Sequence, residues 1–156
     1  MDNKNCTVEK VGIRYGLFLA GGLIAYFLLM QLLGLADILE LRFLNLFILI
    51  AAVVGALKYY KKHSNHLMTY FKGIGVGVFT SMVGAVIFAL FMGVYLGVIA
   101  PGFYETIRSE APTYASQITP VTVSFVILLE GVISGFMTTF IAMQWYKVPH
   151  GENPTE

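Results

Sequence analysis

Charged residues are scarce in this sequence, and their scarcity decides its class. Of 156 residues only 12% are charged and 57% are hydrophobic, whereas a soluble domain carries about 25% charged residues. The single cysteine, Cys6, excludes a disulfide within the chain. The three histidines lie outside the apolar runs, so no pair of them could hold a haem within a membrane, and the spacing of His63 and His66 is weak evidence for a metal. We therefore expect no metal and no cofactor.

Long apolar runs fill most of the chain, and each is long enough for a helix that crosses a hydrocarbon core about 30 Å thick. Little remains beside them for a soluble catalytic module. The sequence thus predicts an all-α protein with one transmembrane domain over residues 1–156, an integral membrane four-helix bundle with antiparallel neighbours. The expected spans are residues 11–35, 41–60, 70–100 and 121–146.

Glycine and proline mark the ends of these runs. Gly34 is expected to end the first helix and Pro101 the third. Residues 101–120 form the longest connection, an outer loop. Thr119 and Pro120 have the residue types of an N-cap and a first helical position, so the fourth helix is expected to begin there.

The few basic residues are unevenly distributed. If the N-terminus is cytoplasmic, eight of the ten Lys and Arg residues fall in inside segments, and only Arg42 and Arg108 fall outside. By the positive-inside rule this split predicts a multi-pass protein of the bacterial inner (cytoplasmic) membrane with both termini in the cytoplasm. The inside residues are Lys4, Lys10, Arg14, Lys58, Lys61, Lys62, Lys72 and Lys147.

The third run carries a small residue at every fourth position. A step of four residues turns about 400°, so the row forms an inclined groove rather than a straight face. Small residues let a second backbone come close in lipid, and we expect them to be helix-packing positions. Because the row is longer than one neighbour needs, part of it could receive another subunit or a lipid. The row is Gly73, Gly77, Ser81, Ala85, Ala89, Gly93 and Gly97, and Gly131 and Gly135 in the fourth run repeat the pattern.

Glu130 interrupts the apolar stretch VILLEGVISG in the fourth run. In the expected helix it lies about 14 Å from the outer end, near the membrane midplane. It shares one half of the helix circumference with small and polar residues, whereas bulky apolar residues fill mainly the other half. We therefore expect Glu130 to point inward, toward protein. The small and polar half comprises Glu130, Gly131, Ser134, Gly135, Thr138, Thr139 and Ala142.

No full counter-charge is expected at the depth of Glu130, since Arg14 sits near the inner end of its helix. An ionised carboxylate in hydrocarbon is costly, which favours the protonated acid. Three interpretations stay open: a neutral hydrogen-bonding group between helices, a proton-coupled or cation-binding site, and a contact with a basic residue of another subunit. The candidate intramembrane polar site consists of Glu130, Ser134, Thr138, Ser81, Thr80 and Tyr26.

Two stretches of the sequence resemble a known family. They are RYGLFLAGGL and, after a short outer turn and a basic inner loop, YFKGIGVGVFTSMVGAVIFALFMGVYLGVIAPGFYETI. Their most specific parts are the Gly/Ser row that opens the third helix and the ending Pro101-Gly102-Phe103-Tyr104-Glu105. The order is similar to that of a family of small four-helix bacterial inner-membrane proteins, common in Bacteroidota and catalogued as a domain of unknown function. The resemblance implies the fold and the location, and it transfers no catalytic residue.

Two functions are compatible with these features. The first is a non-enzymatic integral membrane protein, an accessory, scaffold or assembly subunit that associates through its small-residue grooves. The alternative is a small oligomeric proton-coupled transporter that uses Glu130 as its protonatable site. The expected partners are the lipid bilayer and other membrane subunits or further copies of the chain, with no nucleic acid. Because no catalytic constellation is present, we expect no enzymatic activity.

Overall fold

The structure, a computed structural model, describes residues 7–34, 43–63, 69–99 and 118–146, together with five single residues between 102 and 116. Within these residues, each long helix is long and apolar enough to cross a membrane. The predicted all-α bundle of four such helices is confirmed, whereas most of the expected outer loop 101–120 lies outside the described residues. The helices are α1 (Val8–Leu32), α2 (Phe43–His63), α3 (Tyr70–Val94), which continues into the π-helical turn η3 (Tyr95–Ile99), and α5 (Pro120–Tyr146).

The start of α5 follows from two adjacent residues. The hydroxyl of Thr119 accepts a hydrogen bond from the backbone amide of Thr122 at 3.1 Å, which satisfies one of the free amides of the first turn. Pro120 is the first helical residue, a position where its missing amide is not needed. The predicted cap of this helix is therefore confirmed.

Glycine also sets the end of α1. Gly34 has a φ of +69°, a conformation that strains most side chains, and its amide donates to the carbonyl of Gln31 at 3.2 Å. The last helical residue is Leu32, so the predicted stop at Gly34 is correct. At the end of α3, Pro101 lies outside the described residues, and the helix runs through η3 to Ile99.

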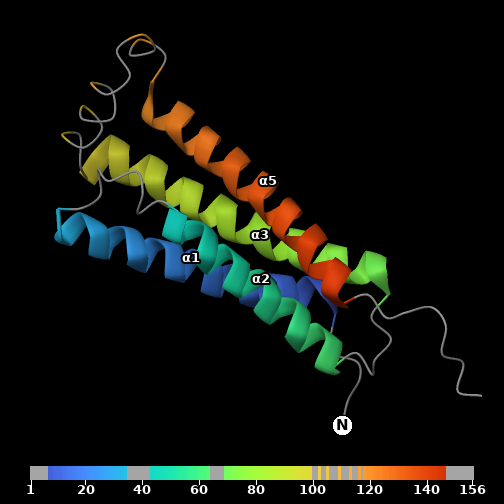
Figure 1. The fold of residues 1–156 in the computed structure, drawn as a ribbon. Helices are drawn as coiled ribbons and strands as arrows, with labels where there is room; N and C mark the ends of the chain where they lie inside the picture. Colours follow the sequence, from blue (N-terminus) through green and yellow to red (C-terminus); the bar gives the residue numbers. More distant parts are fainter. Residues whose placement is uncertain are drawn as a thin grey trace, which may run out of the picture.

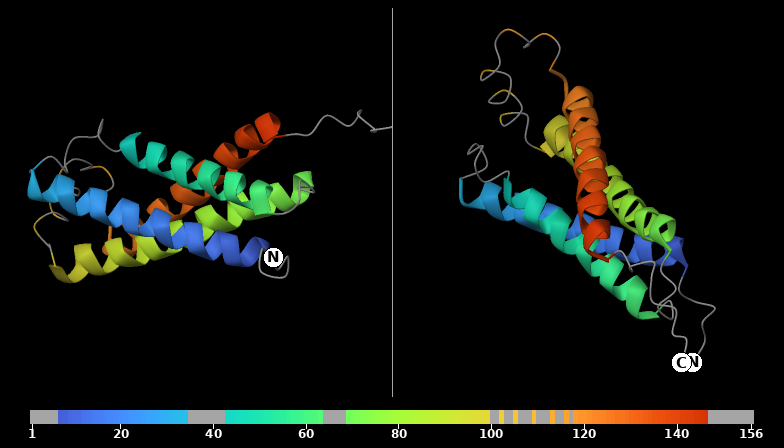
Figure 2. Two further views of the ribbon diagram at one scale, coloured as in Figure 1. Left: turned by 90° about the horizontal axis from the view of Figure 1, so that it is seen from below. Right: turned by 45° about the vertical axis from the view of Figure 1, so that its right-hand side comes forward.

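α3 is the central helix of the bundle. Figure 1 shows it between α5 on one side and α1 and α2 on the other, and its most extensive contacts are with α1 and α5. Successive helices run antiparallel, as predicted, whereas α1 and α3, which pack together over much of their length, run parallel. The two views of Figure 2 show that α1 begins at the end of the bundle where α5 finishes.

Two glycines let α1 and α3 come close together. A Cβ atom added to Gly12 would lie 2.6 Å from the ring of Phe79, and one added to Gly16 would lie 2.7 Å from the Cβ of Val83. The residue numbers of the partners rise together, as parallel helices require. Within lipid the hydrophobic effect does not drive helices together, so close packing of this kind stabilises the pair.

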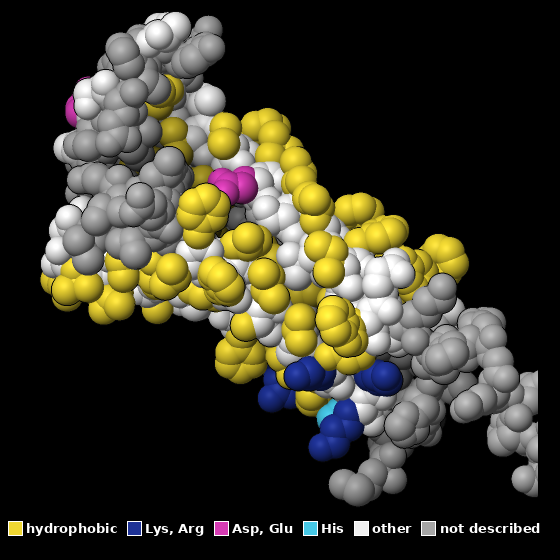
Figure 3. Space-filling view, in the orientation of Figure 1, with side chains coloured by type: hydrophobic (Ala, Val, Ile, Leu, Met, Phe, Trp, Pro, Cys, Tyr) yellow, Lys and Arg dark blue, Asp and Glu magenta, His cyan; other side chains and the backbone are white. Residues whose placement is uncertain are grey.

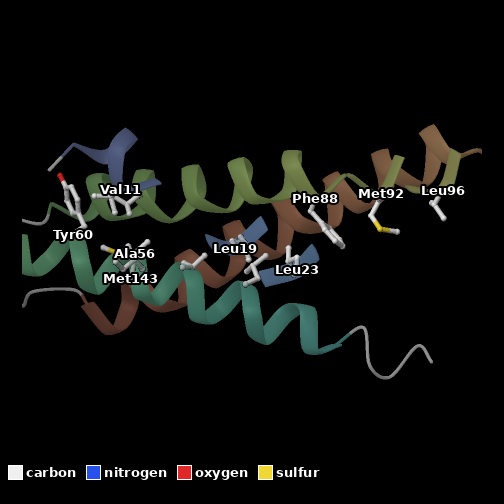
Figure 4. Close-up of a cluster of buried hydrophobic side chains, with 13 residues drawn as sticks. Val11, Leu19, Leu23, Ala56, Tyr60, Phe88, Met92, Leu96 and Met143 are labelled. Atoms are coloured by element: carbon white, nitrogen blue, oxygen red, sulfur yellow. The ribbon is translucent and has the colours of Figure 1, made fainter. Parts of the chain in front are cut away.

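Buried apolar side chains extend along the bundle. Figure 4 shows this cluster from Val11 and Tyr60 at one end to Leu96 at the other, with Met143 bringing α5 into it. All four long helices therefore contribute to one core. Its members are Val11, Leu19, Leu23, Leu49, Val53, Ala56, Leu57, Tyr60, Val76, Phe88, Met92, Leu96 and Met143.

Basic side chains gather at one end of the molecule, where α1 begins and α2 finishes (Figure 3). The guanidinium of Arg14 on α1 lies 5.7 Å from the ring centre of Tyr59 on α2. Likewise, the ammonium of Lys61 on α2 lies 5.3 Å from the ring centre of Tyr146 on α5. Such cation–π contacts contribute about 0.5–1 kcal/mol each at exposed sites. The basic residues therefore also stabilise the contacts of α2 with α1 and with α5 at this end.

The glycine packing of α1 can be tested by adding one methyl group. We expect Gly16→Ala to lower the thermal midpoint of the detergent-solubilised protein, because the new Cβ would lie 2.7 Å from Val83 and 3.0 Å from the backbone oxygen of Thr80. Overpacking of this kind costs about 1–3 kcal/mol.

The matched control is Gly21→Ala on the same helix, since a Cβ at Gly21 meets no atom within 4 Å. Its thermal midpoint, measured by the loss of the monodisperse chromatographic peak after heating, should equal or exceed that of the parent. Equal losses in both variants would contradict the α1–α3 packing.

Candidate functional site

The row of small residues on α3 lies against α5 of the same chain. A Cβ added to Gly77 would overlap the side chain of Thr139, and one added to Gly135 would overlap Ser81. Each helix thus presents a glycine where the other presents a hydroxyl-bearing side chain. The two backbones approach more closely here than larger side chains would permit.

The contact continues toward the other end of both helices. A Cβ added to Gly131 would lie 2.8 Å from the Cβ of Ala85, and one added to Gly93 would lie 2.8 Å from the Oγ of Ser124. As the row advances along α3, its partners recede along α5, as antiparallel helices require. The contact reaches Gly97, which lies 4.0 Å from Pro120 by the same measure.

α5 of the same chain therefore fills most of this groove, and the prediction that part of it receives another subunit or a lipid stays a prediction for the end at Gly97. From Gly77 to Gly93 the row faces α5, and Gly73 and Ala89 are buried, whereas Gly97 at the end of the row is exposed. α5 is itself long and follows the inclined row along its course, so it leaves little of the row uncovered.

The buried hydroxyl groups of the interface are satisfied by their own helices. The hydroxyl of Thr80 donates to the carbonyl of Val76 at 2.7 Å, and that of Ser81 donates to Gly77 at 2.9 Å. On α5, Thr139 donates to the carbonyl of Gly135 at 2.7 Å. Each bond closes within one turn of helix, so these side chains act as compact packing groups rather than as polar links between helices.

Glu130 does not point inward as its position on the polar half-face predicted. Its side chain is exposed, and it makes no hydrogen bond or ion pair with any residue that the structure describes. Gly131, one residue and about 100° further around the helix, is the residue that faces Ala85. The contact with α3 is a narrow stripe rather than half a circumference, and Glu130 lies outside it.

The face that carries Glu130 is otherwise apolar. Val126 is 55% exposed, Ile133 56% and Met137 59%, and these residues lie one or two turns above and below the acid. Figure 3 looks onto this side of the molecule and shows an acidic side chain among hydrophobic ones. In a membrane this surface meets lipid tails or another protein, so a carboxyl group is placed where lipid offers it no hydrogen-bonding partner.

The six residues of the predicted polar site do not converge. Thr80 and Ser81 are buried at the helix interfaces, Ser134 and Thr138 are half-buried on α5, and Tyr26 is half-buried on α1. Only Glu130 among them is exposed. The predicted site is therefore divided between the buried helix interfaces and the exposed face of α5.

The sequence patterns did not predict an aromatic cluster near the C-terminal ends of α1 and α3. Phe27 of α1 packs edge-on against Tyr95, with ring centres 5.0 Å apart, and Phe91 stacks on the same tyrosine at 5.8 Å. Tyr95 opens the π-helical turn η3, whose wider spacing changes the face on which later residues lie. Neither hydropathy nor the spacing of small residues predicts such a turn.

Chemically, the site offers a single ionisable group. Within the described residues, no three His, Cys, Asp or Glu side chains are placed to hold a metal ion. A shallow apolar depression lies further along α5, lined by Phe136, Met137, Phe140 and Ile141. The arrangement is therefore a carboxyl group beside an apolar surface, able to exchange a proton or a hydrogen bond with something outside the chain.

Comparison with known proteins gives one match. A family model described as Protein of unknown function (DUF4199) matches residues 14–147, which include most of α1 and all of the other helices. No protein of curated function and no solved structure matches the chain. The resemblance inferred from the sequence is thus confirmed, and the match assigns no activity.

The outward position of Glu130 predicts a mild phenotype in the isolated chain. We expect Glu130→Leu to leave the thermal midpoint of the detergent-solubilised monomer unchanged, because no bond within the chain is lost and exposed substitutions usually change stability by less than about 0.5 kcal/mol. Gly135→Leu is the matched control on the same helix and should lower the midpoint strongly, since its side chain would overlap Ser81. A clear loss of stability in Glu130→Leu would show that the acid has a partner inside the monomer.

Proposed function

The chain belongs to the DUF4199 family, and on that premise we propose that it is a non-enzymatic membrane protein, an accessory, scaffold or assembly subunit. In this proposal it associates with other membrane helices through the outward face of α5. The grooves of small residues serve the internal packing instead. The proposal places the protein in the bacterial inner membrane.

The observation that carries this proposal is the exposed carboxyl group of Glu130 on a lipid-facing helix. Polar side chains within membrane spans almost always face protein or water, because they are costly in hydrocarbon. Since α3 covers the opposite side of α5, a partner for Glu130 has to come from outside the described part of the chain. An associated membrane helix supplies that partner without requiring any change in the bundle.

Burial along the helices supports the same surface. Only 11% of the most apolar stretch of α5 is buried within the chain, compared with 39% for α3 with η3. α5 is thus the long helix with the largest share left for outside contacts. Exposed apolar residues alone would fit lipid equally well, but together with Glu130 they favour a protein partner.

A proton-coupled transporter is the second candidate, favoured by the same ionisable group in mid-span. The monomer offers it little support, because the buried hydroxyls of Thr80, Ser81 and Thr139 bond to their own helices and do not line a path to Glu130. In this alternative, the path for the proton would have to form between copies of the chain.

Extraction in mild detergent separates these readings. We expect the full chain to be recovered in a stable complex larger than the monomer. Glu130→Leu should dissociate this complex. Phe18→Leu, at an exposed apolar position of α1, should leave it intact. Native mass spectrometry reports the composition. Recovery of a lone monomer from both the parent and the control would contradict the subunit proposal, and proton flux that Glu130→Gln abolishes would favour the transporter.

The proposed orientation can be tested with the chain's single cysteine. We expect Cys6 to react with a membrane-impermeant maleimide only after the cells are permeabilised, because both termini are predicted to be cytoplasmic. In a Cys6→Ser background, Thr113→Cys in the outer loop should react in intact cells. The reverse pattern of labelling would invert the topology.

A further inference from the structure

We propose that the outward face of α5 binds a second copy of this chain, so that the two Glu130 side chains meet each other within the membrane. This inference rests on the proposed function as an associated membrane subunit and names its partner. It concerns a line of residues, called here the outer seam of α5. The seam comprises Val126, Glu130, Ile133 and Met137, and it ends before Phe140 and Gln144, which contact Tyr70 of α3.

The spacing of the outer seam is that of a helix packed against another helix. Its members follow one another at steps of four, three and four residues, and all four are exposed in the single chain. Such a 3.5-residue repeat can keep one side of a helix against a partner over successive turns. Glu130 is the polar member of the seam, and apolar members lie on both sides of it.

The depth of Glu130 in the membrane favours a second copy of the chain as the partner of α5. Every copy of a chain is inserted into the membrane in the same orientation, so two α5 helices that meet side by side run parallel. In a parallel pair, the same heptad position of each helix faces its equivalent. Glu130 therefore meets Glu130 of the second copy at equal depth, with no adjustment of register.

The chemistry of the acid also suits a pair of identical residues. A protonated carboxyl group carries one O–H donor and one carbonyl acceptor, so two of them can exchange two hydrogen bonds. The resulting pair has no net charge and needs no counter-ion in hydrocarbon. Among the described residues, Arg14 and Lys61 do not supply a counter-charge from a second copy, because they lie at the basic end of the bundle, where they contact aromatic rings.

The apolar residues of the seam give the second copy a surface to fit. Met137 belongs both to the seam and to the shallow depression on α5, which Phe136, Phe140 and Ile141 complete. Bulky side chains from the facing helix can lie in this depression one to three turns away from Glu130. The acid pair then fixes the register, and the apolar residues supply the contact area.

Cysteine cross-linking in native membranes tests this interface. In a Cys6→Ser background, Ile133→Cys lies on the seam, and Leu90→Cys on α3 is a matched control that is also well exposed. With two differently tagged copies co-expressed, we expect Ile133→Cys to give a cross-linked product that contains both tags. Leu90→Cys should give none.

A second substitution tests the role of the acid itself. Adding Glu130→Leu to Ile133→Cys should weaken association by roughly threefold to twentyfold, the range expected for an interhelical polar contact in a membrane. Adding Glu130→Gln should preserve the product, because paired amides can also exchange hydrogen bonds. The monomer peak on chromatography checks that both variants are folded.

The remaining outcomes separate this inference from the proposed function. If Ile133→Cys cross-links only to a different protein, the second-copy inference is wrong and the subunit proposal stands. If neither position cross-links and the chain is recovered as a monomer, both are wrong. An equal yield with Leu and with Glu at position 130, or an equal yield from Leu90→Cys, would also overturn the pairing of the two acids.

Discussion

Where α3 and α5 meet, each helix places a glycine opposite a small side chain of the other. Gly77 faces Thr139 and Gly135 faces Ser81, and a methyl group added at either glycine would overlap its partner. In lipid no hydrophobic free energy draws the helices together, so this close packing has to stabilise the pair. This packing determines which side of α5 is buried. α1 packs on another side of α3, the central helix.

The position of Glu130 is a consequence of that contact. Because the stripe that touches α3 passes through Gly131, the residue before it is turned away from the protein and toward the lipid. A carboxyl group in this place is stabilised by nothing in the described part of its own chain. The same close packing that stabilises the monomer therefore leaves this polar group on its outer surface, and in the proposed function the acid serves association while the internal grooves serve packing.

Most of the fold could be predicted from the sequence, because long apolar runs, the Thr119 cap and the Gly34 stop each have a local physical cause. The parallel pairing of α1 with α3 could not, since hydropathy identifies a membrane-spanning helix without naming its neighbour. For the site, the predicted direction of Glu130 was wrong, while its predicted depth in the membrane stays a prediction. The prediction divided α5 into two halves and grouped Glu130 with Ser134 and Thr138, whereas α3 contacts only a narrow stripe of α5.

The most direct test of this account is a disulfide between α3 and α5. In a Cys6→Ser background, Gly93→Cys and Ser124→Cys would place their Cβ atoms about 3.7 Å apart, within the range of natural disulfides. The account predicts a bond within one chain on mild oxidation, and none when Val94→Cys, which is exposed, replaces Gly93→Cys. A bond that forms only between two chains would show that the row on α3 receives another subunit, and would contradict the account.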